Sequence, residues 1–243
     1  MAELIALLMV TVGQLLGSGA PPADMAEQVT STLEQNSPFT VEAIEVNIAA
    51  EDPGDLPEGY KPAGDTFRLE FSFTDIEIEP LLIHDLDISV GGICAGPEGT
   101  LTLGSIDFEA LIEDSALEEA LKSHAPSIKG PSLKIRNRGI TLAGSYQTWL
   151  AAVPFSVDGG LRVANQTQLV FEIDKSSMAG IGIPEAVNNL IEGEVNPVYD
   201  LQDFVKRSKK DIERAKDQLD YEFFLEVSRL KPKNGHIIVA GTA

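Results

Sequence analysis

The sequence is poor in cysteine and in basic residues, and each shortage excludes a class of site or partner. Cys94 is the only cysteine among 243 residues, so no intramolecular disulfide and no cysteine-based zinc site can form. The 18 basic residues are outnumbered by 38 acidic ones, which gives a formal net charge of −20. So acidic a chain repels the backbone of a nucleic acid, and we therefore expect no nucleic-acid partner.

Motifs for catalysis and nucleotide binding are also missing. The chain has no G-x-G-x-x-G and no G-x-x-x-x-G-K-[ST] motif, and it has neither G-x-S-x-G nor H-E-x-x-H. No local motif surrounds the three histidines, His84, His124 and His236. Asp75, Glu77 and Glu79 alternate with apolar residues, a pattern that fits the solvated face of a strand better than a cation site. We therefore expect a protein that is not an enzyme and that has no metal and no cofactor.

The N-terminal segment resembles a secretory signal in outline. Leu4–Ala20 is apolar around its whole circumference and is too short for a comfortable membrane span. Ser18 and Ala20 place small residues at the −3 and −1 positions of a cleavage site, although Met1–Glu3 lacks the usual basic residues. We expect residues 1–20 to be a signal peptide and the protein to be exported to the periplasm or cell envelope. The alternative is an N-terminal core helix in a cytoplasmic protein.

Strand patterns dominate the chain from Val41 onward. Phe67–Phe73 alternates apolar and polar residues with period two, and the phase changes at Thr74–Asp75, as a bulge or bend requires. The next segment is expected to place Leu82, Leu86, Ile88 and Val90 in one register. Glycine-containing turns are predicted at Asn137–Gly139, Asp158–Gly160 and Lys231–Gly235. Such short links predict antiparallel pairing.

Short helices are expected between the strands. Residues 24–35 suit an amphipathic helix with Asp24 as its N-cap and a buried stripe of Met25, Val29 and Leu33. In residues 115–125, Ser115 and Glu118 fit a capping box.

A third short helix should have Pro184 in its first turn and Gly193 just past its end. Together the patterns predict an α+β fold in which a long, curved antiparallel β-sheet wraps around short amphipathic helices.

A charged helix is predicted over Val205–Leu219, where basic and acidic residues are interleaved. It suits either a solvated helix held by ion pairs or a patch that approaches anionic lipid headgroups. For the second role, the candidate headgroup contacts are Lys206, Arg207, Lys209 and Lys210. A second basic cluster consists of Lys134, Arg136 and Arg138.

The end of the chain resembles the LmeA-like phospholipid-binding family of bacterial envelopes. The resemblance rests on the proline-led helix from Pro184, the N-P-x-x-D-L phrase at Asn196–Leu201, and a final strand that closes at Gly241. It extends over Val41–Ala243, within a single domain expected at residues 24–243. The charged helix at residues 205–219 looks like an insertion in the family's pattern.

The resemblance implies a tubular lipid-binding-like fold with an apolar groove for acyl chains. It also implies non-enzymatic binding or transfer of phospholipid or another acyl lipid, with peripheral contact with a membrane. The candidate groove residues are Phe67, Phe71, Phe73, Phe108, Phe155 and Phe171, with Trp149 at the rim. Ordinary core packing is the alternative for each residue. The alternative functions are a structural or interaction protein with a packed core and no lipid, and a hydrolase.

Overall fold

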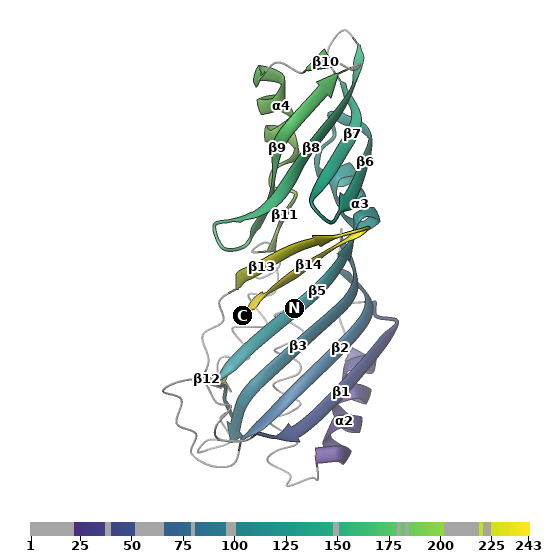
Figure 1. The fold of residues 1–243 in the computed structure, drawn as a ribbon. Coiled ribbons are helices and arrows are strands. Elements are labelled where there is room, and N and C mark those ends of the chain that lie inside the picture. Colours follow the sequence, from purple (N-terminus) through teal and green to yellow (C-terminus); the bar gives the residue numbers. More distant parts are fainter. Residues whose placement is uncertain are drawn as a thin grey trace.

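The protein is elongated, with two antiparallel β-sheets arranged end to end (Figure 1). The structure is a computed structural model, which describes residues 22–36, 40–51, 66–78, 81–95, 101–147, 151–178, 181–182, 185–201, 219–220 and 225–243. The residues of the expected signal peptide and nearly all of the expected insertion at 205–219 lie outside these ranges. Leu219 is described and belongs to a short strand.

The larger sheet has the strand order β1-β2-β3-β5-β14-β13. Its strands are β1 (Ala43–Ala50), β2 (Phe67–Ile78), β3 (Leu81–Ala95), β5 (Ser105–Glu113), β14 (His236–Thr242) and β13 (Glu226–Lys233). All five pairings along this order are antiparallel. The short strands β4 (Leu101–Thr102) and β12 (Leu219–Asp220) pair with each other in parallel, and β4 also pairs with β3. The final hairpin of the chain thus completes a sheet that begins near its N-terminal end.

The smaller sheet is a meander with the order β10-β9-β8-β7-β6, and β11 pairs with β9. Its strands are β6 (Ile128–Arg136), β7 (Gly139–Gln147), β8 (Ala152–Ala164), β9 (Gln168–Met178), β10 (Ile181–Gly182) and β11 (Tyr199–Asp200). The turn predicted at Asn137–Gly139 is present: Arg136 pairs with Gly139 across the two residues Asn137 and Arg138. Consecutive antiparallel pairing follows from these short connections, as the sequence predicts.

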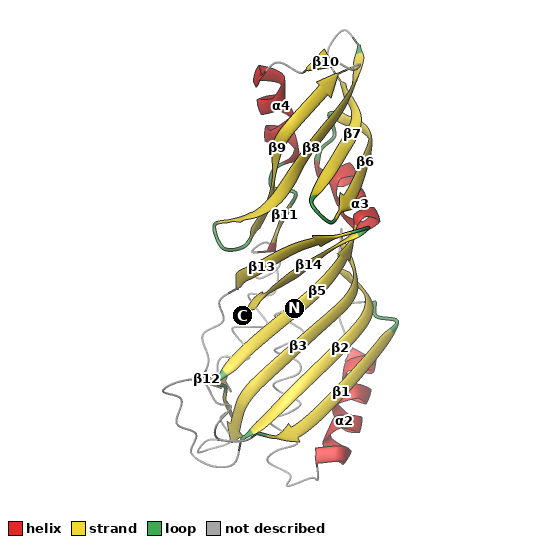
Figure 2. Ribbon diagram, viewed as in Figure 1, coloured by secondary structure: helices red, strands yellow, loops and turns green. Residues whose placement is uncertain are grey.

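Three described helices lie against the sheets (Figure 2). Helix α2 (Pro22–Asn36) packs on β1 and buries Met25, Val29 and Leu33, which confirms the predicted stripe. Helix α3 (Asp114–His124) follows β5 and contacts β6, so that it bridges the two sheets. Helix α4 (Glu185–Val195) lies against β9. The α+β class with a curved antiparallel sheet is confirmed.

The predicted helix ends are wrong in detail. Asp24 is not an N-cap, because α2 already begins at Pro22. The N-cap of α3 is Glu113, so the predicted capping box at Ser115 does not form; strand β5 runs directly into the helix. Gly193 lies inside α4 because the helix continues until Val195, which is buried one turn after Ile191.

The predicted turn at Asp158–Gly160 is also wrong. Strand β8 continues through this segment, with a register shift between Asp158 and Gly159, and the chain reverses at Asn165 and Gln166, both of positive φ. A Cβ atom on Gly159 would lie 1.9 Å from the carbonyl oxygen of Glu172 and 3.0 Å from the ring of Phe171. Gly159 therefore does not form a turn. Its lack of a side chain lets β9 come close to β8 at a bulge inside the sheet.

The predicted change of phase in β2 is confirmed, and it extends into β3. Asp75 has a φ of 48°, and both Phe73 and Ile76 are buried. Strand β3 shifts in the same place, where Ile83 and Leu86 are both buried and Leu82 is 45% exposed. The predicted register is therefore wrong at Leu82. Strand β3 pairs with β2, so it must change phase where β2 does if the apolar residues of both strands are to stay on the same face.

Two hairpin turns join the sheets. The backbone N–H of Asn137 donates to Oδ1 of Asn234 at 3.3 Å, and the N–H of Asn234 donates to Oδ1 of Asn137 at 3.2 Å. The N–H of Gly235, whose φ of 82° favours glycine, donates to the carbonyl oxygen of Ile135 at 2.9 Å. The β13–β14 turn of the larger sheet is thereby held against the β6–β7 turn of the smaller one.

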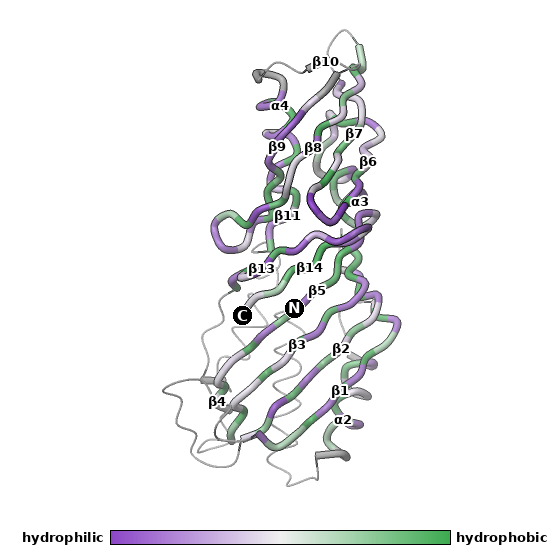
Figure 3. Tube along the Cα trace, viewed as in Figure 1, coloured by the Kyte–Doolittle hydropathy of each residue, from purple (hydrophilic) through white to green (hydrophobic). Residues whose placement is uncertain are grey.

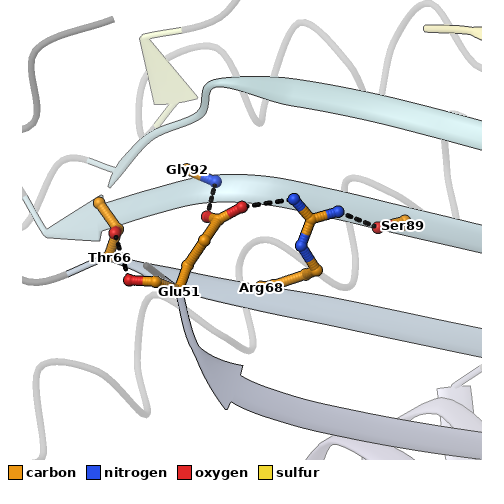
Figure 4. A network of polar contacts seen from close by, with 5 residues as sticks. All are labelled: Glu51, Thr66, Arg68, Ser89 and Gly92. Carbon is orange, nitrogen blue, oxygen red and sulfur yellow. Dashed lines mark hydrogen bonds and ion pairs between the residues drawn. The ribbon is translucent and has the colours of Figure 1, made fainter. Parts of the chain in front are cut away.

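A buried carboxylate fastens the far ends of β1, β2 and β3 together (Figure 4). The side chain of Glu51 is 2% exposed, and it accepts hydrogen bonds from Nη2 of Arg68 and from the N–H of Gly92, each at 2.5 Å. Nη1 of Arg68 also donates to Oγ of Ser89 at 3.1 Å. A buried charge is tolerated only when it is paired and hydrogen-bonded in this way.

Replacement of Arg68 by leucine should destabilise the fold by about 3 kcal/mol, because it leaves the Glu51 carboxylate buried without its counter-charge. The matched control is Arg162→Leu, whose partner Glu172 is exposed and whose loss should cost at most about 1 kcal/mol. Urea unfolding of both variants measures the difference. Equal losses would show that the Glu51 network does not depend on its charge.

Replacement of Gly159 by alanine should destabilise the protein by about 3 kcal/mol, because the new methyl group meets the backbone of β9. Gly160→Ala is the control, since a Cβ there meets nothing within 4 Å. Its effect should stay within about 0.5 kcal/mol. Thermal unfolding of the two variants tests the bulge, and a stable Gly159→Ala protein would contradict it.

Candidate functional site

The larger sheet carries a continuous apolar face that is set by strand register. Phe71 pairs with Ile88, Ile88 with Phe108, and Phe108 with Gly241. The rows on either side are also apolar and buried: Leu69, Val90 and Ile106, and Phe73, Leu86, Ala110 and Val239. Figure 3 shows the resulting alternation of hydrophobic and hydrophilic residues along these strands. The apolar side chains of four strands thus share one curved face.

The candidate groove residues divide between the two sheets. Phe67, Phe71, Phe73 and Phe108 belong to the larger sheet, where Phe71 and Phe73 stack with ring centroids 6.3 Å apart and Phe67 is half-buried. Phe155 and Phe171 are buried in the smaller sheet. All but Phe67 belong to one apolar cluster that runs through both sheets, and Phe67 packs against it. That these rings contact an acyl chain stays a prediction.

The other candidates, Trp149 and the four headgroup residues Lys206, Arg207, Lys209 and Lys210, lie outside the described residues.

Three of the phenylalanine rings rest near glycines of neighbouring strands, which our sequence analysis missed. A Cβ atom on Gly241 would lie 2.9 Å from the ring of Phe108, and one on Gly144 would lie 3.5 Å from the ring of Phe155. A Cβ atom on Gly159 would lie 3.0 Å from the ring of Phe171. A glycine within an otherwise regular strand pattern is the signal that could have revealed these contacts.

The N-P-x-x-D-L phrase fastens the chain to β9. Nδ2 of Asn196 donates to the carbonyl oxygen of Phe171 at 2.8 Å, and its Oδ1 accepts from the N–H of Phe171 at 2.7 Å. The carboxylate of Asp200 accepts from Nε2 of Gln168 at 2.9 Å. The peptide bond between Asn196 and Pro197 is cis. The motif therefore holds α4 and β11 against the strand that carries Phe171.

A cavity of about 580 Å³ lies on the opposite, polar face of the larger sheet. Its polar lining includes carboxylates of Glu70, Asp87, Asp107 and Glu109 together with hydroxyl groups, and Arg229 forms an ion pair with Glu109. In the part of the chain that the structure describes, no group of three or more His, Cys, Asp or Glu side chains is arranged to hold a metal ion.

A half-buried histidine–carboxylate pair lies where β2 and β3 change phase. Nδ1 of His84 lies 2.7 Å from Oδ1 of Asp75. This hydrogen bond is the main cause that raises the pKa of His84 above 6.5. It is also the main cause that lowers the pKa of Asp75 below 3.8, and a hydrogen bond with Glu42 lowers the pKa of Asp75 further. The raised pKa of His84 stabilises the fold below pH 6.5, and this stabilisation is lost as the pH rises through the folded-state value. The lowered pKa of Asp75 stabilises the fold above pH 3.8, and this stabilisation is lost as the pH falls through the folded-state pKa of Asp75.

Titration of the His84 ring by NMR should therefore give a pKa above 6.5, and Asp75→Asn should return that pKa toward 6.5. Asparagine suits the substitution because it tolerates the positive φ at this position. An unaltered His84 titration in the variant would mean that the pair does not form in solution.

A family model described as LmeA-like phospholipid-binding matches residues 65–242, which run from the start of β2 to the end of β14. No curated protein and no solved structure matches the chain. No helix among the described residues is long and apolar enough to span a membrane. Because the family model covers well over half of the chain, this protein belongs to the LmeA-like phospholipid-binding family.

Proposed function

We propose that this protein binds phospholipid-like molecules in the cell envelope without catalysis, and that it holds their acyl chains against the apolar face of the larger sheet. The observation that carries the proposal is the register of that face, in which buried apolar side chains of β2, β3 and β5 form rows, one of which continues to Val239 in β14. Membership of a phospholipid-binding family supports the choice of ligand.

The apolar cluster extends over both sheets. It continues from the larger sheet, through α3, into the smaller sheet, where Phe155 and Phe171 belong to it. Each CH₂ group removed from water contributes about 0.8 kcal/mol, so one acyl chain is sufficient for useful affinity. A ligand that lies along this cluster would have its long axis parallel to that of the molecule.

The remaining parts of the proposal concern location and headgroup. We propose export to the periplasm or cell envelope through the signal-like residues 1–20, and a role in holding lipid or in transferring it between membranes. Lys206, Arg207, Lys209 and Lys210 are the proposed headgroup contacts, and they would also bring the protein to the surface of a membrane.

Replacement of Ala110 by phenylalanine distinguishes this function from that of a structural protein with a solid core. Ala110 lies in the middle of the apolar face and is buried. If an acyl chain occupies this region, the added ring should displace it, so that native mass spectrometry finds co-purified lipid on the wild type and little on the variant, with a similar melting temperature in both.

If the interior is instead solidly packed, the added ring should destabilise the protein by about 1 to 3 kcal/mol and no lipid should accompany the wild type. That outcome would overturn the proposal. Leu111→Phe is the matched control, because its side chain points to the opposite face of β5, and it should leave lipid retention unchanged.

A further inference from the structure

The basic residues of this acidic protein fall into two groups. Arg68, Lys122, Arg162 and Arg229 form ion pairs with carboxylates. The other described basic residues form no ion pair within the described part of the chain. With the exception of Lys129, they lie near the two facing turns or on β9, two strands away from β7. These are Lys134, Arg136, Arg138, Lys175, Lys231 and Lys233, which we call the junction surface.

The fold brings the junction surface together from distant parts of the sequence. Arg136 and Arg138 flank Asn137 in the β6–β7 turn, while Lys233 precedes Asn234 in the β13–β14 turn. Since Asn137 and Asn234 exchange hydrogen bonds, the two sets of cations are held side by side. Figure 3 shows both turns as hydrophilic segments between the sheets.

Strand register adds Lys175 to the surface. Lys134 pairs with Thr141, Thr141 with Asp158, and Asp158 with Lys175, so these side chains form one row on the outer face of the smaller sheet. A cavity of about 320 Å³ beside this row is lined by Arg136, Arg138 and Lys175, and also by two carboxylates, Asp158 and Asp174. Asp158 already accepts a hydrogen bond from Oγ1 of Thr141 at 2.6 Å.

The two sheets differ in charge. Strands β1, β2, β3 and β5 carry one basic residue, Arg68, and nine acidic ones: Glu45, Glu70, Asp75, Glu77, Asp85, Asp87, Asp107, Glu109 and Glu113. Residues 128–178, which contain β6 to β9, carry six basic residues and three acidic ones: Lys129, Lys134, Arg136, Arg138, Arg162 and Lys175, and Asp158, Glu172 and Asp174. In the larger sheet, β13 differs from these four strands, because it carries Arg229, Lys231 and Lys233 and one acidic residue, Glu226. An anionic surface is therefore repelled by β1, β2, β3 and β5 and attracted to β13 and to the smaller sheet.

We propose that the junction surface docks the protein on a bilayer rich in anionic phospholipid, an inference that rests on the proposed lipid-binding function. All six side chains are exposed and are spread over strands β6, β9 and β13 and the β6–β7 turn. A site for one phosphate would instead gather partly buried donors around a single point. Exposed cations near an anionic bilayer each contribute attraction that is screened by salt. Docking here would place the bilayer beside the apolar cluster, where it passes from one sheet to the other.

The test is co-sedimentation of the full chain with vesicles of phosphatidylcholine alone or mixed with phosphatidylglycerol. We expect binding only to the mixed vesicles and loss of binding at high salt. Because each cation near the surface contributes about 1 kcal/mol, Arg136→Gln combined with Arg138→Gln should weaken vesicle binding by about tenfold or more. Lys231→Gln with Lys233→Gln is the second variant, and thermal unfolding reports whether each variant folds.

The matched control is Lys122→Gln with Arg229→Gln, which removes the same charge from ion-paired residues outside the junction surface and should leave binding within about twofold. An equal loss in the control, or no loss in either junction variant, would overturn the proposal. So would displacement of the protein from vesicles by inorganic phosphate beyond that by chloride of the same ionic strength, because this would indicate a phosphate pocket.

Lipid retention, measured by native mass spectrometry, tests the proposed lipid-binding function separately from the proposed docking surface. A wild-type protein that retains lipid but ignores anionic vesicles disproves the docking surface and leaves the proposed function intact. A protein that binds these vesicles and retains no lipid disproves the proposed function.

Discussion

The apolar side chains of β2, β3, β5 and β14 must all point to one face, and the antiparallel register of the larger sheet makes them do so. Phe71, Ile88 and Phe108 face each other across three strands, and a slip of one residue in any strand would turn its apolar set toward water. The positive φ of Asp75 matters for this reason. It lets β2 change phase as it bends, β3 changes phase with it, and the bent sheet keeps a single apolar face.

Glycines and asparagines adapt the rest of the chain to this face. Gly241 and Gly159 allow the rings of Phe108 and Phe171 to lie against neighbouring strands, and each glycine comes close to a backbone carbonyl that any larger residue would strike. Asn196 binds both backbone groups of Phe171, and Asn137 and Asn234 join the two sheets. A long apolar interior thus extends through a molecule whose sheets touch at the β6–β7 and β13–β14 turns, through helix α3, and where the N–H of Val227 in β13 donates to the carbonyl oxygen of Gln166 in the β8–β9 turn.

Local sequence patterns predicted some elements correctly because neighbouring residues decide them. The alternation of Phe67–Phe73, the stripe of Met25, Val29 and Leu33, and the turn at Asn137 are of this kind. Predictions failed where a distant strand decides the outcome. Gly159 resembles a turn residue in the sequence and lies in a bulge because β9 approaches it, and Leu82 is exposed because its strand follows the kink in β2.

The sequence by itself determined the α+β class, the acidic surface and the phenylalanine-rich apolar strands, because composition and two-residue periodicity are properties of the chain alone. It also carried the resemblance to a lipid-binding family, which rests on the motifs at Pro184, Asn196–Leu201 and Gly241. Only the tertiary structure decided which apolar residues share a face and which cations gather. Lys175 and Lys233 are 58 positions apart and lie near Arg136 and Arg138 because strand pairing and the contact between turns bring them there. Hydrogen bonds between distant segments fix that arrangement, and no local pattern encodes them.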